Sequence, residues 1–92
     1  MKVTVQFQGI LADWVGTRSA SFDLQPVAML ADLMEEIRCR YGEHMHEGLW
    51  DQERNAFKSQ IVPISDGEIL RSLDIPLEDG EEIRFFIMAG GG

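Results

Sequence analysis

The sequence predicts an α+β domain in which one main helix packs across a mixed sheet of four to five strands. Three segments support this prediction. Residues 2–8 alternate apolar and polar side chains, residues 27–41 repeat apolar side chains at helical spacing, and residues 81–88 alternate again. A period of two is typical of strands and a period near 3.6 of a helix. One helix across a sheet buries the apolar faces of both elements.

The first strand, over residues 2–8, places its apolar side chains on one face and ends at Gly9. Residues 11–16 are expected to form a compact connection with apolar residues of its own. A second strand is expected at 20–24, where Phe22 and Leu24 share a face. Two strands therefore precede the main helix.

The main helix is predicted to begin at Pro26, because the first helical turn does not need the missing proline N–H. Its apolar residues cluster on one side of a helical projection; they are Val27, Leu30, Leu33, Met34, Ile37 and Tyr41. Arg38 and Arg40 lie near the carboxyl end, where positive charge suits the helix dipole. Gly42 is a plausible C-terminal cap.

The middle of the chain is less regular. Residues 43–53 are expected to form a short irregular helix or a loop, and residues 56–65 a strand that lies at an edge or is irregular near Pro63. Asp66-Gly67 is a strong hairpin signal. A further turn is expected at residues 77–80, before the last strand.

The last strand, residues 81–88, has two different faces. Ile83, Phe85 and Ile87 lie on one face, and Phe86 and Met88 lie on the other. If the helix covers only one side of the sheet, Phe86 and Met88 are exposed and form a docking surface for a partner. The alternative is that the segment around Trp50 covers them.

Length and composition exclude several classes of protein. The 92 residues correspond to one domain, and 8 Lys and Arg against 16 Asp and Glu give a net charge of −8. This acidic balance argues against nucleic-acid binding and suits docking on basic partners. No apolar run approaches the roughly 20 residues of a membrane span. The start of the chain lacks the apolar stretch of a secretory signal.

A reducing, cytoplasmic location is expected. Cys39 is the only cysteine of the chain, so an internal disulfide cannot form.

The chain ends in Ala89, Gly90, Gly91 and Gly92 directly after the last strand. We expect a folded domain over residues 1–88 and a flexible tail over residues 89–92, because glycine loses the most entropy on ordering. A tail without side chains can thread into a narrow channel of a partner enzyme, and four residues extend roughly 13 Å. The α-carboxylate expected on Gly92 becomes an acyl donor only after activation. Taken alone, a glycine run also fits a frayed terminus.

The whole arrangement resembles a ubiquitin-like β-grasp domain, and more narrowly the MoaD/ThiS family of sulfur carriers. The resemblance rests on Val3–Phe7 at the start, Leu11–Gly16 in the first connection, Leu77–Ile83 before the last strand and Phe85–Gly92 at the end. The chain length and the Phe85–Phe86 pair are most similar to the molybdopterin synthase small subunit. Members often carry Pro or a small apolar pair before the terminal Gly-Gly, and this chain departs from that pattern.

The resemblance implies a carrier that is not itself an enzyme and binds no cofactor or metal. An E1-like enzyme would adenylate Gly92 with ATP, and a sulfur donor of the cysteine desulfurase or rhodanese type would convert it to a thiocarboxylate. The sulfur would pass to an acceptor enzyme such as a molybdopterin synthase large subunit. Related carriers serve thiamine, tRNA thiolation or cysteine synthesis. A protein modifier that forms isopeptide bonds to lysines, or a plain binding module, are the other possibilities.

The remaining polar candidates have weaker support. His44 and His46 offer too few ligands for zinc, so a solvated surface is the preferred interpretation. Cys39 lies opposite the apolar face of the helix with no histidine at helical spacing, which indicates a structural cysteine. A set of carboxylates could contact a basic partner or simply keep the domain soluble; it comprises Asp51, Glu53, Glu78, Asp79, Glu81 and Glu82.

Overall fold

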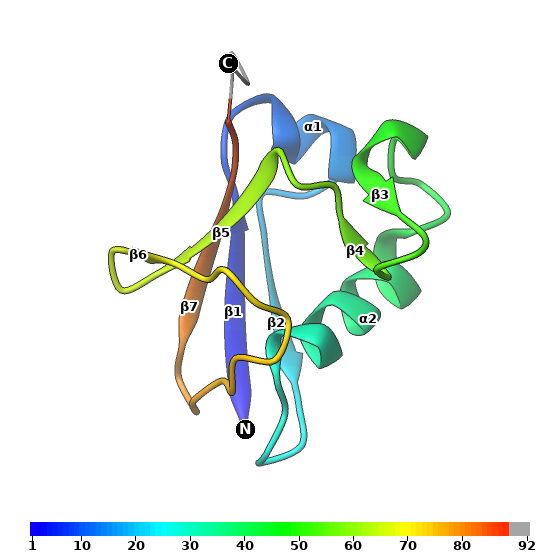
Figure 1. Ribbon diagram of the computed structural model, residues 1–92. Coiled ribbons are helices and arrows are strands. Elements are labelled where there is room, and N and C mark those ends of the chain that lie inside the picture. Colours follow the sequence, from blue (N-terminus) through cyan, green and yellow to red (C-terminus); the bar gives the residue numbers. More distant parts are fainter. Residues whose placement is uncertain (89–92) are drawn as a thin grey trace.

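The computed structural model describes residues 1–88. It contains a five-stranded mixed sheet, and a 12-residue helix crosses one face of this sheet (Figure 1). The sheet has the order β2-β1-β7-β5-β6. Its strands are β1 (Lys2–Phe7), β2 (Ser19–Asp23), β5 (Ile61–Ser65), β6 (Glu68–Ile69) and β7 (Glu82–Ile87). The other elements are α1 (Ile10–Val15), α2 (Leu30–Tyr41), the 3-10 helix η1 (Glu47–Leu49), β3 (Trp50–Asp51) and β4 (Ala56–Phe57).

The first and last strands lie side by side at the centre of the sheet. β1 and β7 pair in parallel, with Val5 opposite Ile83 and Phe7 opposite Phe85. β2 pairs antiparallel with β1, and β5 pairs antiparallel with β7. The predicted mixed sheet with one main helix is thereby confirmed, and it is the β-grasp arrangement that the family resemblance implies.

The core lies between the sheet and α2. Val3, Val5, Ile83 and Phe85 have no exposed surface, and α2 contributes four buried side chains, Leu30, Leu33, Met34 and Ile37. The alternation predicted for the outer segments of the chain therefore separates a buried face from an outer face, as a half-buried strand requires.

The main helix begins later than predicted. Pro26 precedes the helix, and Val27, expected on its apolar face, is 82% exposed. The first helical turn is set by tertiary contacts, because the N–H groups of Leu30 and Ala31 both donate to carbonyls of the 73–75 segment at 2.9 Å. These bonds satisfy helix N–H groups that have no intrahelical partner.

Two segments of the chain differ from the sequence prediction and one agrees with it. The segment 11–16 belongs to α1, which ends at Gly16 with φ 104°. Residues 43–53 contain η1 and β3, in keeping with the expected short irregular helix. The strand predicted over 56–65 is divided into β4 and β5 by a turn in which the Ile61 N–H donates to the Lys58 carbonyl.

The predicted turns are confirmed. Asp66 and Gly67 adopt φ of 52° and 79° and join β5 to β6, and Gly80 adopts φ 83°. Pro63 lies in the strand next to the edge strand, and its carbonyl accepts the Leu70 N–H at 2.9 Å. Gly42 is the C-cap of α2, although its φ of −55° is right-handed.

Within residues 1–88, none of the helices combines the length and the apolar character that crossing a membrane requires.

Candidate functional site

The turn before β7 is held against the start of β1. The Gly80 N–H donates to the Lys2 carbonyl at 2.7 Å, and the Lys2 N–H donates to Asp79 Oδ1 at 2.8 Å. Gly80 needs its positive φ to make this turn, since residues with a Cβ rarely adopt it. The acidic Asp79-Gly80 pair therefore aligns β7 with β1.

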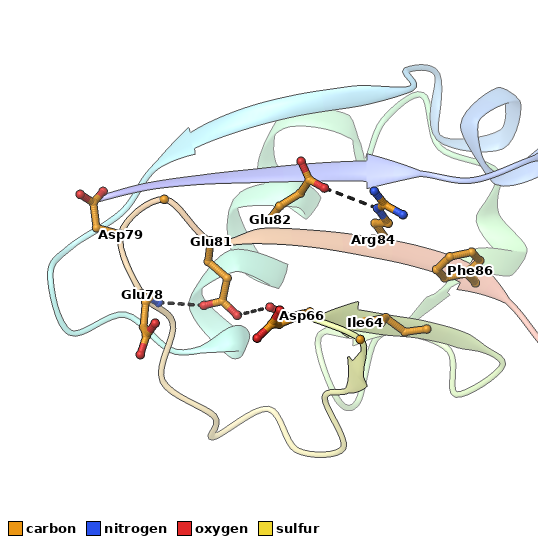
Figure 2. A pocket seen from close by; sticks show the side chains of 11 residues that line it. Ile64, Asp66, Glu78, Asp79, Glu81, Glu82, Arg84 and Phe86 are labelled. Atoms are coloured by element: carbon orange, nitrogen blue, oxygen red, sulfur yellow. Dashed lines mark hydrogen bonds and ion pairs between the residues drawn. The ribbon is translucent and has the colours of Figure 1, made fainter.

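Glu81 extends these hydrogen bonds to the neighbouring strand β5. One oxygen of its carboxylate accepts the Glu78 N–H at 2.8 Å, and the other accepts the Ser65 hydroxyl at 2.5 Å (Figure 2). Ser65 is the buried polar end of β5. The carboxylates of Asp79 and Glu81 thus have structural partners, and position β7 between its two neighbours.

The far end of β7 is also held from both sides. Phe85 stacks on Phe7 with ring centroids 5.6 Å apart, and its carbonyl accepts the Gln8 N–H at 3.1 Å. On the other side the Met88 N–H donates to the Gln60 carbonyl at 2.7 Å. The described chain is therefore anchored up to Phe85 on the β1 side and up to Met88 on the β5 side. The predicted site residues Ala89, Gly90, Gly91 and Gly92 lie outside the described residues.

The outer face of the sheet carries an apolar patch around Phe86. Val62 pairs with Phe86 and Ile64 pairs with both Arg84 and Ile69, so the four apolar side chains share the face turned away from α2. We call Val62, Ile64, Ile69 and Phe86 the outer apolar face. Phe86 is half-buried and Ile69 is 38% exposed. The sequence prediction found Phe86 and missed the other three, because their strands are short and their period imperfect.

Carboxylates surround one end of this face. A depression contains Ile64 and Phe86 together with Asp66, Glu78, Asp79, Glu81 and Glu82, and Arg84 is its single basic residue (Figure 2). Arg84 Nε lies 3.4 Å from Glu82 Oε1, a pair that solvent screens. An apolar centre with a negative border has the chemistry to meet a partner surface with an apolar centre and basic residues around it. Asp51, by contrast, accepts the Glu53 N–H in its own turn.

Phe86 and Met88 line different depressions. Met88 is 53% exposed and belongs to a groove beside β5. Trp50 packs edge-on against Phe57, whose ring in turn contacts Phe85 on the core side. The alternative in which the Trp50 segment covers Phe86 is therefore wrong.

The histidine and cysteine residues have structural surroundings. His46 Nδ1 accepts the Gly48 N–H at 3.0 Å and caps η1, and its ring lies 5.6 Å from that of Trp14. Among residues 1–88, no group of three or more potential ligands could hold a metal ion. Cys39 is exposed on α2, as its position opposite the apolar face predicts.

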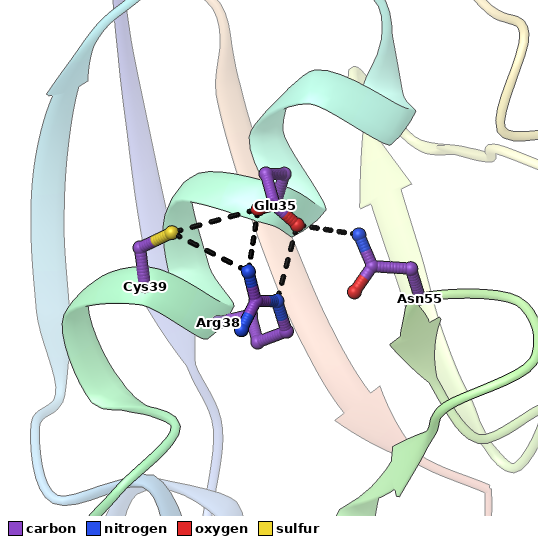
Figure 3. Close-up of polar contacts among 4 residues, drawn as sticks. All are labelled: Glu35, Arg38, Cys39 and Asn55. Atoms are coloured by element: carbon purple, nitrogen blue, oxygen red, sulfur yellow. Dashed lines mark hydrogen bonds and ion pairs between the residues drawn. The ribbon is translucent and has the colours of Figure 1, made fainter.

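A polar cluster around Glu35 ties α2 to the turn before β4 (Figure 3). The Glu35 carboxylate accepts two bonds from Arg38, at 2.6 and 3.1 Å, and one from the Asn55 amide. The Arg38 bonds, followed by the Asn55 bond, lower the pKa of Glu35 from 4.5 to about 2. Cys39 Sγ lies 3.6 Å from the same carboxylate. Sequence analysis missed this cluster because Asn55 lies 20 residues beyond Glu35.

Solved structures with the same fold cover nearly the whole chain. The small archaeal modifier protein 1 (SAMP1) of Haloferax volcanii superposes with a TM-score of 0.81 at 17% identity and covers 100% of both chains. A Pyrococcus furiosus protein assigned as molybdopterin converting factor subunit 1 gives 0.71 at 24% identity, over 95% of this chain and 97% of that one. A chain of the Amycolatopsis orientalis BexX/CysO complex gives 0.67 at 20% identity, over 98% and 99%.

No protein-family model and no curated protein matches the sequence. The structural likenesses show that the protein has the ubiquitin-like β-grasp fold, which confirms the fold that the sequence resemblance implies. The neighbours that share this fold include a molybdopterin converting factor subunit and an archaeal modifier protein. Fold alone does not define function, which must be argued from the site.

Proposed function

We propose that the protein is a sulfur carrier whose terminal Gly92 is adenylated by an E1-like enzyme and converted to a thiocarboxylate, and that this thiocarboxylate delivers its sulfur in molybdopterin synthesis. In the first step a Gly92 carboxylate oxygen attacks the α-phosphorus of ATP and pyrophosphate leaves. The terminal sulfur of the donor's persulfide then attacks the acyl adenylate and AMP leaves, and a thiol reduces the resulting acyl disulfide, which breaks the S–S bond and releases the thiocarboxylate. The carrier contributes the acyl group and the recognition surface, and the activating enzyme contributes the ATP site.

The anchoring of β7 is the observation that carries this proposal. The last strand lies in the middle of the sheet and is hydrogen-bonded up to Phe85 on the β1 side and up to Met88 on the β5 side. A terminal segment that enters a partner's active site needs a rigid base, because misplacement of a reacting group by about 1 Å costs about a hundredfold in rate. The four residues after Met88 reach roughly 13 Å from that base.

The outer apolar face supports the same proposal as the docking surface. It contains Phe86, two residues before the end of the described domain, and lies on the side of the sheet that α2 leaves open (Figure 1). A partner enzyme whose docking surface has an apolar centre bordered by basic residues would contact the outer apolar face and the carboxylates around it. The E1-like enzyme, the donor and the acceptor subunit are the partners that the proposal requires.

Intact mass spectrometry tests the proposal. Protein isolated from its native source must first show the mass of a chain that ends at Gly92. Incubation with ATP, an E1-like enzyme and a sulfur source should then replace one oxygen by sulfur, and fragmentation should localise the change to Gly92. A terminus that stays an unmodified carboxylate, while a control carrier is modified by the same enzyme, would contradict the proposal.

A matched pair of variants tests the docking surface. Phe86→Ala should slow adenylation by the E1-like enzyme by about tenfold, the effect of losing one well-placed apolar contact. Thr4→Ala alters the outer face at a polar position on β1 and should leave the rate unchanged. Equal effects of the two variants would place the docking surface elsewhere.

A ubiquitin-like modifier is the second candidate, favoured by the likeness to an archaeal modifier protein. Both functions begin with adenylation of Gly92. They differ in product, because a modifier forms isopeptide bonds to lysines and gives a ladder of conjugates in cell extract. Treatment with ATP and extract, followed by blotting, separates the two.

A further inference from the structure

A groove separate from the acidic depression runs between the amino-terminal half of α2 and the edge of β5. In Figure 1 the segment after β6 passes in front of β1 and reaches the amino-terminal end of α2. Most of its lining is apolar, and the residues that form this part include Leu30, Met34, Ile61, Pro63, Leu70 and Leu73. Met88, the last described residue, also lines it.

The charge of this groove is opposite to that of the whole protein. Arg54 and Arg71 both line it, and no carboxylate does, although the net charge of the chain is −8. Neither guanidinium forms an ion pair with any residue of the described chain. Arg54 is held in place by a 3.2 Å bond from its Nη1 to the Phe57 carbonyl, and Arg71 is exposed.

The groove also follows a strand edge that is only partly covered. β6 pairs with β5 only at Ile64 and Ser65, and one further bond reaches the Pro63 carbonyl. Pro63 has no N–H to continue the ladder. The edge of β5 near Ile61 therefore runs along the groove without a neighbouring strand on that side. The Ile61 N–H already donates to the Lys58 carbonyl, so this edge offers a peptide no free N–H at Ile61 or Pro63, and the side chains of the groove would hold the peptide.

We propose that this groove binds an extended peptide segment of a partner protein, in which an apolar side chain lies next to Asp or Glu. The apolar side chain would lie over Leu30 and Leu73, and the carboxylates would meet Arg54 and Arg71. Charge complementarity selects this occupant, because the two arginines attract the carboxylates of the peptide. The acidic remainder of the surface repels the same carboxylates and so does not compete with the groove. The proposal does not depend on the chemistry at Gly92.

Peptide titration of the full-length, unmodified protein tests this assignment. The probe is a fluorescein-labelled octapeptide with leucine and isoleucine followed by aspartate and glutamate. A second peptide replaces the acids by lysine, and a third replaces the apolar residues by serine. The first should bind best, with backbone NMR shifts at Ile61, Arg71 and Leu73, and its affinity should fall as salt rises.

Matched charge reversals complete the test. Arg71→Glu should weaken binding of the acidic peptide by about tenfold, the factor expected when an attractive rim charge becomes repulsive. Arg18→Glu changes the same net charge at a position outside the groove and should leave binding within about twofold. Arg71 makes no hydrogen bond that folding requires among the described contacts, so its variant is expected to stay folded.

Three results would overturn the proposal. They are absence of binding at millimolar peptide, equal binding of the lysine peptide, and shifts confined to Ile64 and Phe86, the residues of the outer apolar face that do not line the groove. Because Gly92 is unmodified throughout, each result leaves the sulfur-carrier proposal untouched, and failure of thiocarboxylation leaves the peptide result untouched.

Discussion

Replacing Phe85 and Phe86 one at a time separates the stabilising face of β7 from its outer face. Phe85 has no exposed surface, and its ring lies 5.6 Å from that of Phe7 and 5.1 Å from that of Phe57. Phe86 is half-buried on the opposite face, where Val62 is its cross-strand partner. The two adjacent phenylalanines should therefore respond very differently to truncation.

Phe85→Ala should lower the free energy of unfolding by about 4 kcal/mol, the middle of the range for a fully buried phenylalanine. This loss is a large part of the total, since a domain of this size has about 5 to 14 kcal/mol. The midpoint of thermal unfolding should fall by about 4 to 8 °C for each kcal/mol lost. Phe86→Ala should cost only about 1 kcal/mol, because its side chain is partly exposed before the change.

Urea unfolding followed by circular dichroism measures both variants. If the alanine variant does not fold, Phe85→Leu takes its place in the comparison with Phe86→Ala. This variant should lower the free energy of unfolding by about 1.5 kcal/mol. A loss for Phe86→Ala as large as that for Phe85→Ala would refute the assignment of the two faces. It would also remove the outer apolar face as a docking surface, since a residue that holds the core together is not available to a partner.

Two further predictions concern local contacts. The pKa of Glu35 is lowered to about 2, chiefly by hydrogen bonds from Arg38. The stability that the Glu35 carboxylate contributes is therefore present above its unfolded pKa, and it is lost as the pH falls from about 4.5 to about 2. Glu35→Gln should therefore reduce the fall in the urea midpoint between about pH 5 and about pH 2.5, and an unchanged fall would contradict the assigned pKa. Gly80→Ala should destabilise by about 1 to 2 kcal/mol, because φ is 83° there. Gly80→Asn, a residue that tolerates positive φ better than alanine, serves as its thermal-unfolding control; equal losses would show that backbone conformation is not the cause.

The sequence alone predicts the elements whose signals are local. β1 and β7 follow from alternation of apolar residues, and the turns at Asp66-Gly67 and Gly80 follow from residues that tolerate positive φ. The fold class follows from combining these elements with one amphipathic helix. The alternation of side chains along a strand likewise predicts the face of the sheet to which Phe86 belongs.

The features that sequence analysis missed depend on contacts between distant residues. The start of α2 is decided by hydrogen bonds to carbonyls of the 73–75 segment, more than 40 residues away. The turn that separates β4 from β5 lets Phe57 pack against Phe85 and Trp50. The activation of Gly92 and the threading of Ala89, Gly90 and Gly91 into a partner stay predictions, because these residues lie outside the described part of the chain.

The order of strands and turns was thus determined by the sequence itself, because alternation and glycine conformation act between neighbours in the chain. Tertiary structure decided which surfaces the domain presents. Val62, Ile64 and Ile69 join Phe86 only when β5 and β6 pair beside β7. Arg54 and Arg71 meet in one groove only when α2 packs across the sheet. Surfaces of this kind arise from residues far apart in the chain, so the local pattern contains no signal for them.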